Sequence, residues 1–183
     1  MAWEADFLLW LQNLRVPFMD GLMTFFSMLG HNGIFCLILG IVLIIIKKTR
    51  RSGVEVIIAM LLSFIISYLV VKNLAARVRP FETYDFLVPL GNAPHGWSFP
   101  SVHSTFAFAT ATVIFCNDKK IGILALVIAA LVAFSRLYMG AHYPTDVLAG
   151  SVFGIIFALL AHYLIYPKCE KWIRGRKEKK SNA

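Results

Sequence analysis

Five long apolar blocks restrict the fold of this chain more than any other feature of its sequence. They consist mostly of Ile, Leu, Val, Ala and Phe, and they cover residues 33–46, 54–71, 102–115, 121–137 and 145–166. Blocks of this kind are typical of helices that cross a lipid bilayer, whereas the core of a soluble domain interrupts them with polar positions. The sequence therefore predicts an all-α fold, a polytopic membrane bundle with five transmembrane helices.

The N-terminal segment, residues 1–29, follows a different pattern. Apolar and polar residues alternate at roughly helical spacing before Pro17, and the side chains of Trp3 and Trp10 suit a membrane–water interface. A modest apolar piece follows at residues 22–29. Two arrangements fit this segment: a pair of amphipathic interfacial helices, which we favour, or a sixth membrane span.

The positive charge of the chain indicates its membrane topology. The net charge is +8 with only 15% charged residues, and much of the basic charge lies beside the apolar blocks, at residues 47–51, in the turn 117–120 and in the tail 168–183. Lys and Arg gather on the cytoplasmic side of membrane proteins. We therefore expect all three stretches to be cytoplasmic. Nucleic acid is not an expected partner, because the chain has no basic, aromatic-rich soluble module.

Five spans then place the remaining connections on the external face of the cell membrane. Residues 30–167 form the predicted membrane core, and residues 73–101 form an external loop over the candidate site. The connection at residues 136–145 lies on the same face. That face carries four cations against the usual charge bias, so we expect local partners to hold them: Lys72, Arg77, Arg79 and Arg136.

Three polar stretches at the ends of apolar blocks carry groups that suit phosphate chemistry. They are KNLAARVRP at residues 72–80, FPSVHS at residues 99–104 and SRLYMGAHYPTD at residues 135–146. Guanidinium groups bind phosphoryl oxygens in a fork, and an ammonium group binds them as a point charge. We therefore predict that Lys72, Arg79 and Arg136 bind phosphate, although a lysine at the end of a span also suits contact with lipid headgroups.

The second and third stretches also carry candidates for acid, base and nucleophile. Ser101 is the expected N-cap of a helix whose first N–H groups point towards an anion, and His103 in its first turn could donate a proton to a leaving alkoxide. Pro144 suits the first position of the last helix, with His142 before it and Asp146 one turn later. A carboxylate there fixes the imidazole tautomer and leaves the other ring nitrogen free to attack.

A metal site is the main chemical alternative for these residues. His103, His142 and Asp146 could form a site with two histidines and one carboxylate. Four nearby cations would repel a divalent metal, and no second acidic cluster is present beyond Glu82 and Asp85. We therefore predict an anion site that needs no metal and no other cofactor.

The three stretches resemble the signature KxxxxxxRP, PSGH and SRxxxxxHxxxD of the type 2 phosphatidic acid phosphatase and vanadium haloperoxidase superfamily. They occur in the same order and cover residues 72–146, with Val102 in place of the glycine. The resemblance implies that His142 is the nucleophile, oriented by Asp146, and that His103 is the general acid. It also implies a phosphate cradle with these members: Lys72, Arg79, Ser101, Arg136 and the amides of Val102 and His103.

The resemblance and the apolar blocks together predict an integral-membrane lipid phosphatase of the outer leaflet with a phosphohistidine intermediate. Undecaprenyl pyrophosphate is the favoured substrate, with phosphatidylglycerophosphate or phosphatidic acid as alternatives. A lipid phosphotransferase and a non-catalytic protein that binds or transports lipid headgroups stay open. A vanadate-dependent haloperoxidase fits less well, because those relatives are soluble. No prediction about oligomeric state follows from the sequence.

Overall fold

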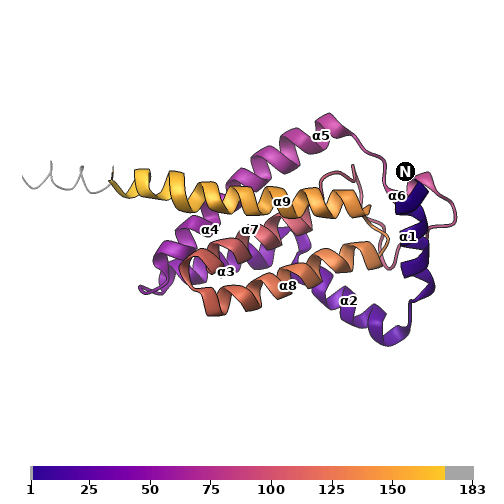
Figure 1. Cartoon of the computed structure of the whole chain (residues 1–183), viewed down its shortest axis with the longest axis horizontal. Helices are drawn as coiled ribbons and strands as arrows, with labels where there is room; N and C mark the ends of the chain where they lie inside the picture. Colours follow the sequence, from indigo (N-terminus) through magenta and orange to yellow (C-terminus); the bar gives the residue numbers. More distant parts are fainter. Residues whose placement is uncertain (1, 172–183) are drawn as a thin grey trace, which may run out of the picture.

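The computed structural model describes residues 2–171, and over this range the chain is a bundle of helices (Figure 1). The predicted all-α membrane bundle is thereby confirmed. Most of the tail predicted to be cytoplasmic, residues 172–183, lies outside the described residues. The helices follow one another in this order: α1 (Ala2–Asn13), α2 (Pro17–Leu29), the 3-10 turn η1 (His31–Gly33), α3 (Ile34–Ile45), α4 (Arg50–Leu62), the π-helix η2 (Ser63–Val71), α5 (Lys72–Ala75), α6 (Pro80–Thr83), α7 (Val102–Asn117), α8 (Lys119–Tyr138), α9 (Pro144–Leu160) and the π-helix η3 (Ala161–Ile165).

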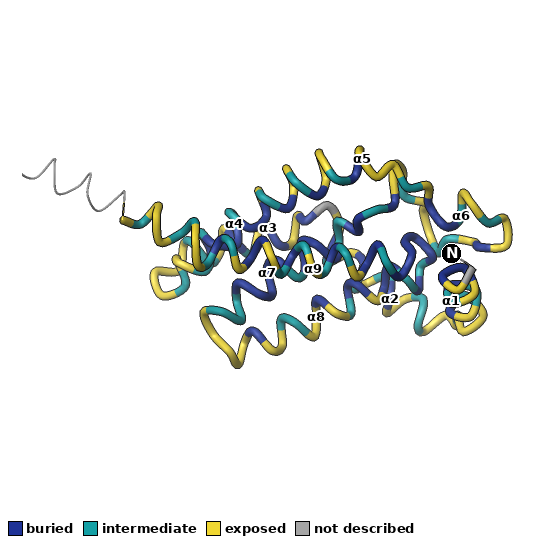
Figure 2. The backbone as a smooth tube through the Cα atoms, turned by 45° about the horizontal axis from the view of Figure 1, so that its top comes forward, coloured by how far each residue is buried: buried dark blue, intermediate teal, exposed yellow. Residues whose placement is uncertain are grey.

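Helix α7 lies at the centre of the bundle, with α8 and α9 on two sides and α4 on a third. Small residues on α7, among them Ala107, Ala109 and Ala111, are almost fully buried and allow the neighbouring helices to approach closely. Figure 2 shows that exposed positions follow the outer sides of the long helices. Many of these exposed side chains are large and apolar, as a surface in contact with lipid requires.

By length and composition, three helices of the described chain can cross a membrane: Arg50–Thr83, Lys119–Tyr138 and Pro144–Lys171. Helices α2 and α3 make a fourth candidate if the pair, bent by 52°, counts as one broken span. Helix α7 is apolar but shorter. The helical membrane bundle is thus confirmed, and the count of five spans stays a prediction.

The N-terminal segment divides into two differently placed helices. Helix α1 lies across one end of the bundle, in contact with α8, whereas α2 packs along α8 and leads through η1 into α3 (Figure 1). The side chains of Trp3 and Trp10 on α1 are more than half exposed. This arrangement ties α1 to the end of the bundle where α5 stops and α9 starts.

The opposite end of the bundle contains the α3–α4 and α7–α8 connections (Figure 1). A buried carboxylate, Glu55, joins several helices there. It accepts hydrogen bonds from Asn117 Nδ2 at 2.7 Å and Arg51 Nε at 2.8 Å, and its Oε2 lies 2.8 Å from His162 Nδ1. The sequence offered no partner for His162, and the structure shows that this histidine is part of a polar cluster between α4, α7 and η3.

Candidate active site

A cavity of about 800 Å³ opens at the end of the bundle near α5 and α6. All three polar stretches singled out in the sequence contribute to its wall, together with α2 and the loop at residues 91–95. Six of the predicted site residues line it: Lys72, Arg79, Val102, His103, Arg136 and His142. The structure therefore brings together cations and imidazoles that are separated by up to seventy residues in the chain.

The cations reach this cavity because their helices end beside it. Lys72 opens α5, which closes one turn later at Ala76, a residue in the left-handed conformation with φ 42°. Arg79 is extended and precedes Pro80, the first residue of α6. Proline disfavours helical geometry in the residue before it, so the chain leaves the helix and turns Arg79 into the cavity.

Arg79 is held by backbone oxygens of the loops at residues 95–96 and 141. Its side chain donates to the carbonyls of Gly96 at 2.7 Å, Ala141 at 2.8 Å and His95 at 3.3 Å, and the residue is only 4% exposed. Its Nη1 also lies 3.5 Å from Nε2 of His142. A fixed guanidinium next to that nitrogen can stabilise negative charge on a phosphoryl group bound there.

Arg136 lies in the last turn of α8 and is also buried. Its Nη1 donates to Ser27 of α2 and lies 3.5 Å from the sulfur of Met139. Its Nε has no hydrogen-bond partner within residues 2–171. A buried guanidinium with an unused donor at a cavity wall suits an anionic ligand, because buried polar groups are normally satisfied.

His142 and Asp146 are the centre of the predicted catalytic group. Asp146 is the third residue of α9, where Oδ2 accepts the backbone N–H of Tyr143 at 2.9 Å, and Oδ2 lies 3.6 Å from Nδ1 of His142. Ser98 Oγ donates to the same carboxylate oxygen and lies 3.4 Å from Nδ1. A proton on Nδ1 directed to Ser98 leaves Nε2, the nitrogen beside Arg79, with its lone pair free.

The imidazole of His142 is kept neutral by its surroundings. Burial lowers the pKa of His142 to about 3, and the positive charges of Arg136 and Arg79 act in the same direction, against the opposing effect of Asp146. A neutral ring is the form that can attack a phosphorus atom. The environment of His142 therefore suits a nucleophile.

Two predicted residues lie behind the cavity wall. Asp146 contacts His142 from the back and is fully buried. Ser101 is the N-cap of α7, as predicted, but its hydroxyl accepts a hydrogen bond from Ser104 at 3.1 Å, and its N–H donates to the carbonyl of Asp146 at 3.0 Å. The Ser101 hydroxyl is thus bonded within the first turn of α7 and does not line the cavity, while Val102 and His103 do.

Several neighbours of the site were not predicted as site residues. Ser98 precedes a signature motif without belonging to it, and Arg77 donates from Nη1 to Asp146 Oδ1 at 2.6 Å. His31 and His95 line the cavity, and the rings of His31 and His103 are 6.3 Å apart between centroids. A histidine between apolar blocks, such as His31, or within the long loop, such as His95, has the same pattern whether it belongs to a site or only lies at the membrane interface.

Metal binding finds no support in the residues that the structure describes. Within residues 2–171, no group of three or more His, Cys, Asp and Glu side chains is arranged to hold a metal ion. The metal-free site stays a prediction.

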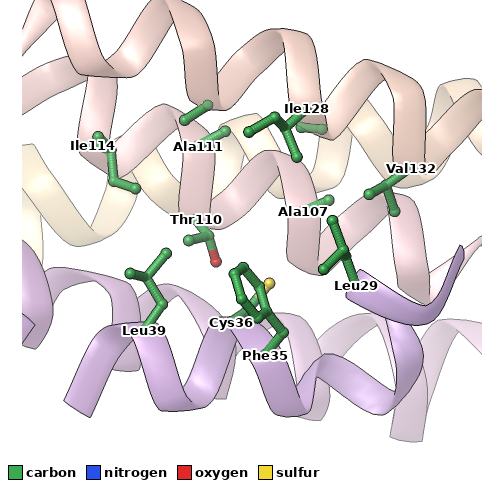
Figure 3. Close-up of a pocket in the computed structure, with 12 residues that line it drawn as sticks. Leu29, Phe35, Cys36, Leu39, Ala107, Thr110, Ala111, Ile114, Ile128 and Val132 are labelled. Carbon is green, nitrogen blue, oxygen red and sulfur yellow. The ribbon is translucent and has the colours of Figure 1, made fainter. Parts of the chain in front are cut away.

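A second, apolar pocket of about 80 Å³ lies deeper in the bundle, between α3, α7 and α8 (Figure 3). Leu29, Phe35, Cys36 and Leu39 face Thr110 and Ile128 across it. No acidic, basic or imidazole side chain lines this pocket, so it offers no group for proton transfer or anion binding.

The sequence profile of the PAP2 superfamily matches residues 52–169, which include every residue of the three signature motifs. The chain belongs to the PAP2 superfamily. The resemblance inferred from the motifs is thus confirmed, and this PAP2 protein is a phosphoric ester hydrolase of the membrane, a lipid phosphatase in the broad sense.

Curated relatives carry several phosphatase names. An undecaprenyl-diphosphatase of Sulfolobus acidocaldarius is 30% identical over 148 residues, which are 80% of this chain and 71% of the relative. The bacitracin transport permease protein BcrC of Bacillus licheniformis is 33% identical over 70% of this chain and 64% of its own length. Phosphatidylglycerophosphatase B of Bacillus subtilis is 33% identical, covering 80% of this chain and 75% of the relative.

Two solved PAP2 structures share the fold. The crystal structure of Aquifex aeolicus LpxE superposes with a TM-score of 0.78 at 28% identity, covering 88% of this chain and 95% of the other. The phosphatidylglycerolphosphate phosphatase of Bacillus subtilis superposes with a TM-score of 0.72, also at 28% identity, covering 87% and 83%. These similarities extend over nearly the whole described chain.

Proposed function

We propose that this PAP2 protein removes a terminal phosphate from a membrane lipid through a phosphohistidine at His142. One observation above all supports the proposal. Nε2 of His142 lies at the wall of a cation-lined cavity, next to the guanidinium of Arg79, while Nδ1 faces Ser98 and Asp146. This is the arrangement that an oriented, neutral imidazole needs in order to attack a bound phosphoryl group.

The first step forms the phosphoenzyme. The lone pair of Nε2 attacks phosphorus, and the bond between phosphorus and the leaving oxygen breaks. His103 gives its proton to that oxygen, since the negative charge of the bound phosphoryl group favours the protonated imidazole. Three cations hold the charge that develops on the phosphoryl oxygens: Lys72, Arg79 and Arg136.

The second step releases inorganic phosphate. His103 accepts a proton from water as the water oxygen bonds to phosphorus, and the bond between phosphorus and Nε2 breaks. The electron pair returns to the imidazole, which regains its neutral form. Asp146 stabilises the positive ring between the two steps. If an alcohol takes the place of water, the same site becomes a phosphotransferase.

Undecaprenyl diphosphate is the substrate that we favour. The undecaprenyl-diphosphatase of Sulfolobus acidocaldarius is among the curated relatives, and so is BcrC of Bacillus subtilis, an undecaprenyl-diphosphatase 30% identical over 62% of this chain and 56% of its own length. The cavity also holds further polar side chains beyond the three cations, among them Asn92 and His95, which suits a headgroup with two phosphoryl groups. Phosphatidylglycerophosphate and phosphatidic acid are the alternatives.

We place the reaction at the outer leaflet. The basic residues 47–51 and the turn 117–120 lie at the end of the bundle opposite the cavity (Figure 1). Basic connections favour the cytoplasmic side of the membrane, which assigns the cavity to the external face. Accessibility of a cysteine introduced at Asp85, in the loop beside the cavity, to a membrane-impermeant thiol reagent in intact cells tests this placement.

Release of inorganic phosphate by detergent-purified protein in excess EDTA tests the function. The panel contains undecaprenyl diphosphate, phosphatidylglycerophosphate and phosphatidic acid, with His142→Ala as the inactive variant and His162→Ala, at the other end of the bundle, as the matched control. Release that persists in EDTA and is lost only in His142→Ala supports a metal-free histidine phosphatase, and the fastest lipid identifies its substrate. Absence of release from every lipid would favour a transferase or a lipid-binding protein.

A further inference from the structure

Arg77 joins two buried carboxylates behind the candidate active site. Its Nη1 donates to Oδ1 of Asp146 at 2.6 Å, and its Nη2 donates to Oε2 of Glu4 at 2.7 Å. Both carboxylates are fully buried, whereas the Arg77 side chain is 26% exposed. One guanidinium therefore connects the N-terminal helix α1 to the residue that orients His142.

Glu4 is held on its other side by the start of α9. Its Oε1 accepts the N–H of Thr145 at 3.1 Å and the Thr145 hydroxyl at 2.6 Å. Burial alone raises the pKa of Glu4, but the hydrogen bonds from Thr145 and Arg77 outweigh it, and the pKa lies below its ordinary value. Glu4 is therefore ionised at neutral pH. It is held at a fixed position, and only Arg77 lies between it and Asp146.

The charges of this group determine how Asp146 acts on His142. Asp146 and Arg77 alone would form a neutral pair, and the imidazole would face a carboxylate whose charge is cancelled. With Glu4 present, the three side chains carry a net charge of −1. A positive imidazole forms when Nε2 attacks phosphorus, so the remaining negative charge stabilises the transition state.

We infer that Glu4 is a positioning residue of the phosphatase reaction: it neutralises and orients Arg77, so that Asp146 keeps its negative charge and its rotamer behind His142. The inference rests on the proposed function, because it assigns Glu4 a part in the same nucleophilic step. It also gives α1 a part in catalysis beyond its contact with the membrane surface.

Phosphate release by Glu4→Gln tests this role. The amide keeps the size of the side chain and removes its charge. We expect kcat to fall about tenfold or more, as for other residues that support a catalytic group from behind, with KM within about threefold of wild type. Inhibition by inorganic phosphate should be unchanged, because Glu4 does not line the cavity. Asp6→Asn, an exposed acid two residues further along α1, is the matched control and should behave as wild type.

A double-mutant cycle separates this role from a general structural one. Glu4 acts through Arg77 in our inference, so Glu4→Gln should change kcat by less than about twofold in an Arg77→Gln background. Equal effects of Glu4→Gln with and without Arg77 would overturn the inference. So would a kcat of Glu4→Gln equal to that of wild type.

Two controls test whether the variants fold and whether the charge matters. The first is the thermal unfolding midpoint in detergent, and the second is Glu4→Asp, which keeps the charge. If Glu4→Gln does not fold, Glu4→Asp still tests the inference. A kcat of Glu4→Asp within about threefold of wild type supports the role of the charge. A loss of kcat of about tenfold or more in a folded Glu4→Asp protein overturns that role. Failure of the proposed function is a separate outcome, recognised when wild type and His142→Ala release phosphate equally.

Discussion

Nδ1 of His142 lies 3.6 Å from Oδ2 of Asp146, and the hydroxyl of Ser98 contacts both atoms. Because Ser98 donates its proton to the carboxylate, its oxygen lone pairs are available to the imidazole N–H. The backbone of Ser98 is held in place by a hydrogen bond, since its N–H donates to the carbonyl of Arg77 at 2.7 Å. The serine thus supports the orientation of the proposed nucleophile together with the aspartate.

Ser98→Ala should therefore lower kcat by about tenfold, less than the loss in Asp146→Asn, which removes the charge as well. KM should change little, because Ser98 does not line the cavity. The measurement is the rate of phosphate release at saturating lipid. Ser63→Ala removes an equally buried hydroxyl that donates only to its own helix at Ala59, and it should retain wild-type kcat. Equal kcat values for the two variants would remove Ser98 from the catalytic group.

The low pKa of His142 makes the stability of the protein depend on pH. Between the ordinary value of 6.5 and the folded value of about 3, the unfolded chain binds a proton at this residue that the folded protein does not. The free energy of unfolding therefore decreases as pH falls below 6.5. His142→Gln lacks this contribution. We expect the thermal midpoint of wild type to fall more steeply than that of the variant between pH 7 and pH 5. Parallel curves would mean that His142 titrates normally in the fold.

Two glycines of α9 allow its close contact with α7. A Cβ at Gly154 would lie 2.4 Å from the carbonyl oxygen of Thr105 and 2.8 Å from the backbone N of Ala109. A Cβ at Gly150 would lie 2.4 Å from the carbonyl oxygen of Ser101, at the start of α7. None of these three backbone atoms can move without shifting α7.

Gly154→Ala should consequently destabilise the protein by about 1–3 kcal/mol, and Gly150→Ala should also lower kcat, because it displaces the turn that carries His103. Thermal unfolding and phosphate release are the measurements. Gly21→Ala on α2 is the control, since a Cβ there meets nothing within 4 Å. That substitution should leave stability unchanged or raise it by up to about 1 kcal/mol. A Gly154→Ala protein as stable as Gly21→Ala would contradict the tight α7–α9 contact.

The buried cluster around Glu55 should matter for stability and not for catalysis. His162→Ala removes one partner of a buried carboxylate, and such losses cost about 3 kcal/mol. Arg51→Gln removes a partner whose side chain is 49% exposed, so its cost should stay below about 1 kcal/mol. Both variants should keep the kcat of wild type. The denaturation midpoints of the two proteins distinguish these expectations, and a larger loss in Arg51→Gln would reverse the assignment.

Local sequence signals were sufficient for the long helices and for the cations and imidazole groups of the three motifs. The apolar blocks mark the long helices because period and length are local properties, and Pro80 and Pro144 mark helix starts because proline constrains its own and the preceding backbone. The cations and histidines at those helix ends, together with the family resemblance for Val102, then indicated six residues that line the cavity. The direction of the Ser101 side chain was not evident, since it depends on how closely α7 approaches α9.

The sequence by itself therefore determined the membrane class of the fold, the family and the cationic and imidazole groups that line the cavity. Only the tertiary structure decided what stands behind them: Ser98 between His142 and Asp146, and Glu4 of α1 bound to Arg77 and Thr145. Glu4 and Thr145 are far apart in the chain, so their contact leaves no local signal. The sequence pattern of an amphipathic helix is also the same whether an acid on it faces water or a buried guanidinium. The packing of α1 across the end of the bundle decides between these two environments, because it buries Glu4 against Arg77.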